Sequence, residues 1–323
     1  MSKITHQPSF LKYHNLMGSS NRYYSDLFRF LDNSGIRFIA DVPLSSLSYV
    51  KIGGVADCVV TPKPTEVSAL IRFLNEHQLP YHIVGGGSNT LFSDDGFRGV
   101  ILSLRAIKGV YLNNDENTLL IYGGEGLSRV VFFAQRLGLT GIENLAGIPG
   151  SMGGAIIGNA GAFGVSVGDV LSSVEIIDSE GQIHRMGKED MGFSYRSSGL
   201  PNGCIITRAI LKLSPTDKEV VKEKTKEYLH KKWQSQPVKE LSLGCVFKNP
   251  IGYFAGKLID DAGCKGMSEG AIFVSQRHAN FFINRGGGTA ADYLRLIDKV
   301  RERVFREFGI VLDLEIRVVG SAI

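Results

Sequence analysis

The sequence predicts an α+β fold with more than one domain, and three observations carry this prediction. Apolar residues recur with helical spacing in residues 65–79 and 289–308. Short apolar or alternating runs, such as Tyr81–Val84 and Ile205–Leu213, are typical of strands. The chain has 323 residues, which is enough for two domains of ordinary size.

The N-terminal part combines a featureless start with short strands and one clear helix. Residues 1–20 show no period, so we expect an ill-ordered arm, and a short helix follows at Ser25–Leu31. Leu44–Gly54 predicts a strand that ends at a Gly-Gly turn, and Cys58–Val60 predicts a second strand. Residues 65–79 predict a helix, because Thr65 can cap it, its apolar residues form one stripe and Pro80 ends it.

The middle of the chain continues with strands and one capped helix. Strands are predicted at Gly99–Leu104, Leu119–Tyr122 and Val174–Ile177. Ser128–Leu137 predicts a helix with its apolar residues inward and Gly138 at its end.

A highly charged helix predicted over Asp217–Trp233 marks the start of a second folding unit. Its lysines and acids form a solvated face. The residues expected beneath that face are Val221, Tyr228, Leu229 and Trp233.

The second unit contains the best-defined helix of the chain. A helix near residues 255–263 and strands at 271–274 and 280–283 come first. Thr289 and Asp292 then resemble a capping box at the start of a helix over Thr289–Phe308, which Gly309 ends. Its expected apolar face comprises Leu294, Ile297, Val300, Val304, Phe305 and Phe308. A last strand over Leu312–Val319 carries Glu315 and Arg317 on the same face.

Composition excludes several classes of protein. The net charge of +4 comes from scattered Lys and Arg residues, which argues against nucleic-acid binding and suits an anionic small ligand. The start lacks the apolar core of a secretory signal, and no run is long enough to span a membrane, so we expect a cytoplasmic protein. The four cysteines are far apart and the histidines are unpaired, so we expect reduced thiols and no metal site.

Two glycine clusters are the features around which the chain is organised. Gly141–Gly164 contains eight glycines, and Gly85-Gly86-Gly87-Ser88-Asn89-Thr90 follows an apolar strand. Such runs let the backbone approach a ligand closely and present N–H groups to phosphate or pyrophosphate, although each cluster alone could also be a tight turn. The first cluster lacks the third glycine of a dinucleotide-binding fingerprint, and Leu258 breaks a phosphate-loop pattern after Gly256-Lys257.

Eight motifs in order resemble the UDP-N-acetylenolpyruvoylglucosamine reductase (MurB) family. The resemblance spans residues 44–320 and indicates the compact type of the family, which lacks an inserted tyrosine loop. The motifs are KIGG at 51–54, VGGGSNTLF at 84–92, GIPGSMGGAIIGNAG at 147–161, YRSS at 195–198, GCVFKNP at 244–250, AGKLIDDAGCKG at 255–266, HANFFIN at 278–284 and LEIRVVG at 314–320.

The resemblance implies a domain organisation, two cofactors and a substrate. It implies an FAD-binding unit of two subdomains, similar to the vanillyl-alcohol-oxidase class, over residues 44–215. A substrate-binding domain over 216–323 returns its last strand to the active site, and residues 1–43 form an arm and short helix. FAD is bound non-covalently, NADPH is the hydride source, and UDP-N-acetylglucosamine enolpyruvate is the substrate. We expect a monomer without nucleic-acid or membrane partners.

The resemblance also implies cofactor-binding and substrate-binding residues. The FAD pyrophosphate and flavin edge are expected at Gly85, Gly86, Gly87, Ser88, Asn89, Thr90, Gly147, Ile148, Pro149, Gly150, Ser151, Gly153, Gly154, Asn159 and Gly161. Substrate is expected at Tyr195, Lys248, Asn249, His278 and Arg317, with Lys248 and Asn249 at the UDP end. A structural role for His278 is an equal alternative.

The implied catalytic residues are Arg196, Glu315 and Cys245. Arg196 and Glu315 hold the negative charge that develops beside the substrate carboxylate, and Glu315 can help only with a raised pKa. As alternatives, Arg196 could be an ordinary ion-pairing residue, and Glu315 with Arg317 a surface pair. Cys245 stands where the family usually has the serine that donates the proton.

Two hypotheses remain for the role of Cys245. A thiol is a stronger acid than an alcohol and stays largely protonated at neutral pH, so Cys245 can be the general acid. Alternatively it only packs, and water supplies the proton. A working thiol predicts sensitivity to alkylation and peroxide. The competing functions are another FAD oxidoreductase of the same fold and a catalytically silent flavin or UDP-sugar binding protein.

Overall fold

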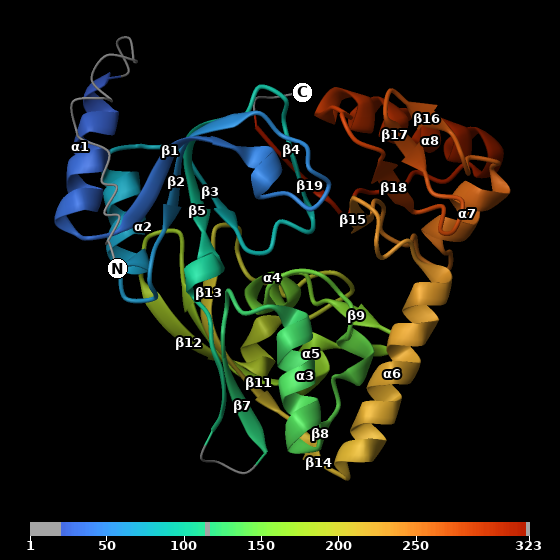
Figure 1. The fold of residues 1–323 in the computed structure, drawn as a ribbon, viewed down its shortest axis with the longest axis horizontal. Coiled ribbons are helices and arrows are strands. Elements are labelled where there is room, and N and C mark those ends of the chain that lie inside the picture. The colour runs from blue at the N-terminus through green and yellow to red at the C-terminus, as the bar shows by residue number, and fades with distance from the viewer. Residues whose placement is uncertain (1–20, 114–116, 321–323) are drawn as a thin grey trace, which may run out of the picture.

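The computed structural model describes residues 21–113 and 117–320, so the arm expected at 1–20 lies outside the described residues. Three sheets of four or five strands, with short two-stranded pairings between them, form its layers (Figure 1). Mixed helix and strand content confirms the α+β class.

The first sheet has the strand order β1-β2-β5-β3. Its strands are β1 Arg37–Pro43, β2 Val55–Thr61, β3 Tyr81–Val84 and β5 Phe97–Ser103. β1 pairs antiparallel to β2, whereas β5 pairs parallel to both β2 and β3. Helices α1 (Asn21–Asn33) and α2 (Val67–Glu76) bury Leu27, Leu31 and Leu70 in the core of this sheet.

The strand predicted over Leu44–Gly54 is wrong. This segment begins with the 3₁₀ helix η2 (Leu44–Ser46) and then folds back, because the Leu44 N–H donates to the Gly54 carbonyl. Lys51 has a φ of 60°, which lies outside the extended range of regular strand backbone. The loop therefore carries Tyr49 to the wall of a cavity described below.

The second sheet is antiparallel, with the order β12-β11-β13-β7-β6. Its strands are β6 Val110–Leu112, β7 Thr118–Tyr122, β11 Leu171–Ile177, β12 Ile183–Gly187 and β13 Ile205–Lys212. Against it pack helices α3 (Leu127–Leu137), α4 (Met152–Ile157) and α5 (Val167–Val170). The remaining elements nearby are η3 Leu104–Ala106, β8 Leu139–Thr140, η4 Glu143–Leu145, β9 Gly161–Ala162, β10 Val165–Ser166, η5 Lys188–Met191 and β14 Ser214–Pro215.

Helix α6 (Lys218–Ser235) leads from the second sheet to the C-terminal unit, along one edge of the molecule in Figure 1. Asp217 caps it by accepting from the Glu219 N–H, as expected of a helix start. Its predicted inner face is partly wrong: Val221 is buried, but Trp233 is 55% exposed, and Lys232 is buried instead.

The third sheet has the order β15-β18-β17-β16. Its strands are β15 Ser242–Cys245, β16 Ser268–Glu269, β17 Ile272–Val274 and β18 Phe281–Asn284, and helices α7 (Ala255–Asp261) and α8 (Ala290–Phe308) cover it. The capping box of Thr289 and Asp292 is confirmed, as is Gly309 in the left-handed conformation at the end of α8. Two residues of the predicted apolar face are wrong, since Phe305 is 55% exposed and Phe308 is 38% exposed.

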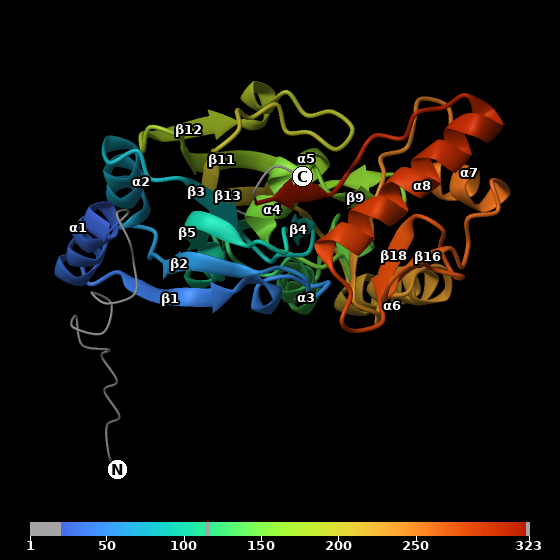
Figure 2. The ribbon, with the colours of Figure 1, turned by 90° about the horizontal axis from the view of Figure 1, so that it is seen from above.

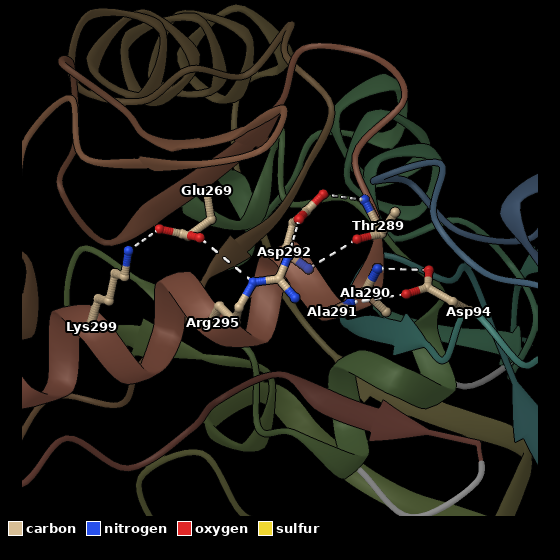
Figure 3. Close-up of polar contacts among 8 residues, drawn as sticks. All are labelled: Asp94, Glu269, Thr289, Ala290, Ala291, Asp292, Arg295 and Lys299. Atoms are coloured by element: carbon tan, nitrogen blue, oxygen red, sulfur yellow. Dashed lines mark hydrogen bonds and ion pairs between the residues drawn. The ribbon is translucent and has the colours of Figure 1, made fainter.

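The C-terminal unit contacts the N-terminal part at several points, among them residues 317–319 and the start of α8. β19 (Arg317–Val319) pairs parallel to β4 (Thr90–Phe92), and the two strands lie side by side in Figures 1 and 2. The strand predicted over Leu312–Val319 is wrong in its first part: Glu315 precedes β19, because its N–H donates to the Val246 carbonyl instead of joining that pairing. The Asp94 carboxylate accepts from the first N–H groups of α8, at Ala290 (2.8 Å) and Ala291 (3.0 Å) (Figure 3). Both β19 and the start of α8 therefore contact the N-terminal part. The predicted boundary at residue 215 stays a prediction.

Candidate active site

A cavity of about 820 Å³ lies where the two glycine clusters meet the C-terminal unit. Its wall includes the three predicted catalytic residues, Arg196, Cys245 and Glu315, together with Arg317. It also includes the predicted cofactor residues Gly85, Gly86, Gly87, Ser88, Asn89, Thr90, Gly147, Ile148, Pro149, Gly150, Ser151, Gly153, Gly154 and Gly161. The fold therefore brings both glycine clusters and the catalytic residues into one space.

The two glycine clusters pack directly on each other. A Cβ added at Gly86 would lie 2.6 Å from the Gly150 Cα, and one added at Gly85 would lie 2.2 Å from the Ser151 Oγ. Ser88 joins the clusters, since its hydroxyl donates to the Pro149 carbonyl at 3.0 Å. No Cβ fits at Gly85 or Gly86, so the cavity wall there consists of backbone and the small Ser88 and Ser151 side chains, which suits a pyrophosphate group.

Arg196 lies at a strained turn. The N–H of Ser194 donates to the Ser197 carbonyl at 3.0 Å and the N–H of Ser197 donates back at 3.2 Å, which closes a tight loop around Tyr195 and Arg196. Arg196 has a φ of 57°, which costs a residue with a side chain roughly 1–2 kcal/mol. The guanidinium also lies over the ring of Tyr195. The strained turn directs Arg196 into the cavity wall.

Arg196 and Glu315 form an ion pair within the cavity. The Arg196 Nε lies 2.7 Å from the Glu315 Oε1, but its N–H does not meet hydrogen-bond geometry. Burial raises the pKa of Glu315 above its usual range, although Arg196 and Lys248 act in the opposite direction. The net direction is upward, so the protonated form of Glu315 is favoured more than in a free glutamate.

Cys245 is a protonated thiol in the same wall. Burial raises its pKa to about 12, and the nearby Glu315 adds to this rise while Arg196 opposes it. Cys245 keeps partial exposure because it lines the cavity. The thiol thus holds its proton throughout the neutral range while facing the space available to a ligand.

Comparison with known proteins places this geometry in a family. The model of the UDP-N-acetylenolpyruvoylglucosamine reductase C-terminal domain matches residues 236–319, and that of an FAD binding domain matches residues 56–187. A UDP-N-acetylenolpyruvoylglucosamine reductase of Lachnoclostridium phytofermentans is 41% identical over 293 residues, covering 89% of this chain and 94% of that relative. The chain belongs to the UDP-N-acetylenolpyruvoylglucosamine reductase family.

Two other members of the family are similar to this chain over nearly their whole length. The reductase of Streptococcus pneumoniae strain JJA is 37% identical over 298 residues, which cover 92% of this chain and 98% of that protein. The crystal structure of the reductase from Thermus caldophilus aligns with a TM-score of 0.76 and 34% identity, covering 88% of this chain and 99% of that one. The family, the FAD-binding fold and the class of enzyme, a flavin-dependent reductase, are thereby confirmed.

Five residues predicted for the site lie outside the cavity wall: Asn159, Tyr195, Lys248, Asn249 and His278. Asn159 donates to the Ser194 carbonyl at 2.9 Å, so it supports the turn that carries Arg196. The Tyr195 hydroxyl accepts from the Asn249 N–H at 3.1 Å, which brings these two predicted substrate residues together.

The other two outlying residues differ in their surroundings. Lys248 lowers the pKa of Glu315 through its charge, so it lies close enough to act on the site. The ring of His278 packs edge-on against Phe281, and burial lowers its pKa. The structural role weighed for His278 is thus supported by packing, whereas its role toward substrate stays a prediction.

The sequence analysis missed several ionisable residues of the cavity wall, among them Lys232 and His82. The Lys232 ammonium is buried and donates to the Asn144 carbonyl at 2.8 Å and to the Ala146 carbonyl at 2.5 Å, and burial lowers its pKa to about 8. Burial and the charge of Arg317 lower the pKa of His82 to about 4, so its ring is neutral. Lys232 lies in a run of lysines typical of a solvated face, so nothing in the sequence singled it out.

The described part of the chain contains neither a membrane-spanning helix nor a metal-binding cluster. None of its helices has the length and apolar character that a membrane span requires. Within residues 21–113 and 117–320, no three His, Cys, Asp or Glu side chains gather as a metal site would need.

Proposed function

We propose that this protein reduces the enolpyruvyl double bond of UDP-N-acetylglucosamine enolpyruvate, giving UDP-N-acetylmuramate for peptidoglycan synthesis in the cytoplasm. NADPH is the reductant and FAD the bound cofactor. The observation that carries the proposal is one cavity in which a backbone glycine cradle, the Arg196–Glu315 pair and a protonated Cys245 thiol meet. Relatives at 37–41% identity bear the name of this reductase.

The glycine cradle fits FAD. Cβ atoms at Gly85 and Gly86 would collide with the facing loop, so only backbone and the Ser88 and Ser151 hydroxyls are available to a ligand there. The proposed cofactor residues are Gly85, Gly86, Gly87, Ser88, Asn89 (through its backbone), Thr90, Gly147, Ile148, Pro149, Gly150, Ser151, Gly153, Gly154, Asn159 and Gly161. When bound and reduced by NADPH, FAD would supply the hydride that adds to the substrate double bond.

Arg196 and Glu315 are proposed to stabilise the charge that this addition creates. Hydride at one alkene carbon leaves negative charge on the neighbouring carbon and its carboxylate. A guanidinium held in a partly buried wall interacts with that charge more strongly than in water. Glu315, with its raised pKa, contributes in its protonated form, in which it donates a hydrogen bond instead of repelling the carboxylate.

Cys245 is proposed as the general acid. Its Sγ–H bond breaks as a C–H bond forms at the charged carbon, and the resulting thiolate regains a proton from water. A pKa of about 12 keeps the thiol protonated at neutral pH and leaves it more acidic than bulk water. The alternative, a packing cysteine with water as the acid, is an outcome of the test below.

The UDP end is proposed to contact Lys248, Asn249 and Tyr195, with Arg317 and His278 nearer the sugar and carboxylate. The Tyr195–Asn249 hydrogen bond supports the proposal that these residues act together. In this scheme residues 44–215 bind FAD, residues 216–323 bind substrate, and the enzyme is a monomer.

Anaerobic stopped-flow absorbance at the flavin band tests the proposal. NADPH should bleach the flavin of the purified protein, and UDP-N-acetylglucosamine enolpyruvate should restore its colour rapidly. Bleaching without recolouring would reject the substrate and favour another FAD oxidoreductase of this fold. Absence of both would favour a binding protein.

Matched variants then test the acid. Cys245→Ser keeps a hydroxyl donor and should retain recolouring, whereas Cys245→Ala should lose on the order of 100-fold or more in rate, as is typical of a removed general acid. Unchanged recolouring in Cys245→Ala would assign the proton to water.

A further inference from the structure

Glu315 lies where the chain crosses from one unit of the protein to the other. Just before it, Leu314 forms a bridge with Phe247 of the C-terminal unit, and the Glu315 N–H donates to the Val246 carbonyl at 2.8 Å. Two residues later Arg317 begins β19, which pairs with β4 of the N-terminal part. The backbone of Glu315 and Ile316 therefore belongs to neither sheet.

The side chain of Asn89 bridges this crossing. Its Nδ2 donates to the Glu315 carbonyl at 3.0 Å, and its own backbone carbonyl accepts from the Arg317 N–H at 2.9 Å. Asn89 thus makes hydrogen bonds to the backbone of Glu315 and Arg317 from the side of the first glycine cluster. From the other side, the carbonyl of Val246, next to Cys245, accepts from the Glu315 N–H. One hydrogen-bonded chain connects the glycine cradle, Glu315 and the strand of the thiol.

We propose that Asn89 is a positioning residue for Glu315. The side-chain amide of Asn89 sets the position of the Glu315 carboxyl group relative to the glycine cradle. This inference rests on the proposed function, and it assigns the Asn89 side chain to Glu315, while the Asn89 backbone keeps its proposed place in the cofactor cradle. The side-chain donor is already directed at the Glu315 carbonyl. A carboxyl group displaced by about 1 Å loses on the order of 100-fold in rate, so this bond matters chiefly for the step that needs Glu315.

The experiment separates positioning from cofactor binding. Asn89→Ala deletes the Nδ2 donor but keeps the backbone carbonyl that Arg317 uses. We expect its FAD dissociation constant, measured by fluorescence on apoprotein, to change less than about threefold, and flavin bleaching by NADPH to keep its rate. Recolouring by the enolpyruvyl sugar nucleotide should slow by about tenfold to 100-fold, with a shift in the pH dependence of that step.

A second readout does not depend on turnover. Hydrogen–deuterium exchange of residues 313–319 should be several-fold faster in Asn89→Ala apoprotein, because the crossing loses one of its anchors. The matched control is Asn75→Ala, since the Asn75 Nδ2 also donates to a backbone carbonyl, that of Ser179 at 2.6 Å, away from the cavity. It should leave exchange at 313–319 unchanged.

Each outcome decides for or against the proposal. A FAD dissociation constant weakened more than about tenfold, with normal half-reactions once loaded, would overturn positioning in favour of a cofactor ligand. Equal slowing of both half-reactions, or no change in recolouring and exchange, would also overturn it. If the wild-type protein is not recoloured, the proposed function fails instead, and the exchange result still tests the anchoring. Asn89→Leu, which has a similar shape, carries no charge and lacks the donor, should reproduce the Ala result if Asn89→Ala folds poorly.

Discussion

The reactivity of Cys245 is the most direct consequence of its surroundings. The sequence alone favours a thiol that alkylating agents attack readily, but burial raises its pKa to about 12 from an ordinary value of 9.0. Only the thiolate reacts, and each pKa unit changes its fraction tenfold. At pH 8 the structure therefore predicts roughly a thousandfold less thiolate than in a free thiol.

We expect iodoacetamide to label Cys245 at least about 100-fold more slowly than a free thiol such as N-acetylcysteine, which allows for the partial exposure of the residue. The rate should still rise tenfold per pH unit between pH 8 and 10, because the thiol stays below its pKa. Mass spectrometry of the peptide that contains Cys245 measures this rate, with Cys245→Ser as the blank.

Labelling at the rate of a free thiol, or a rate that levels off below pH 9, would refute the reasoning. Either result would mean that the thiol has an ordinary or lowered pKa. Arg196 would then outweigh burial and Glu315 in setting the pKa of the Cys245 thiol.

Three further predictions concern stability and cofactor binding. Because burial raises the pKa of Glu315 in the folded protein, the contribution of Glu315 to stability is present at low pH and is lost as pH rises through that pKa. Glu315→Gln should remove this pH dependence of the unfolding free energy, measured by urea unfolding from pH 4 to 8. An unchanged slope of unfolding free energy against pH would contradict the assigned direction. Gly86→Ala should weaken FAD binding by about tenfold or more and cost about 1–3 kcal/mol of stability, because its Cβ would lie 2.6 Å from the Gly150 Cα. The control is Gly126→Ala, whose Cβ would have no atom within 4 Å. It should keep wild-type FAD affinity in the same fluorescence titration. Asp94→Ala should cost about 0.5–2 kcal/mol in thermal unfolding by removing the carboxylate that accepts from the first turn of α8 (Figure 3), and a loss near zero would show that Thr289 caps the helix alone.

The sequence by itself determined the local elements and the chemistry they carry. Helix α8 was predictable because its capping box, apolar period and terminal glycine lie within one continuous segment. The glycine clusters and the residues Arg196, Cys245 and Glu315 were likewise identifiable from motifs, since a motif is a local pattern.

Tertiary structure decided which side chains face which neighbours. On α6, Lys232 is buried and Trp233 exposed, because η4 presents carbonyls that accept from the ammonium, and no local period encodes that partner. The segment over 44–54 became a folded loop because its backbone bonds to itself and to Ser93. The raised pKa values of Cys245 and Glu315 depend on burial by residues far apart in the chain, and the bond from Asn89 to Glu315 joins positions 226 residues apart, so only the folded protein could supply them.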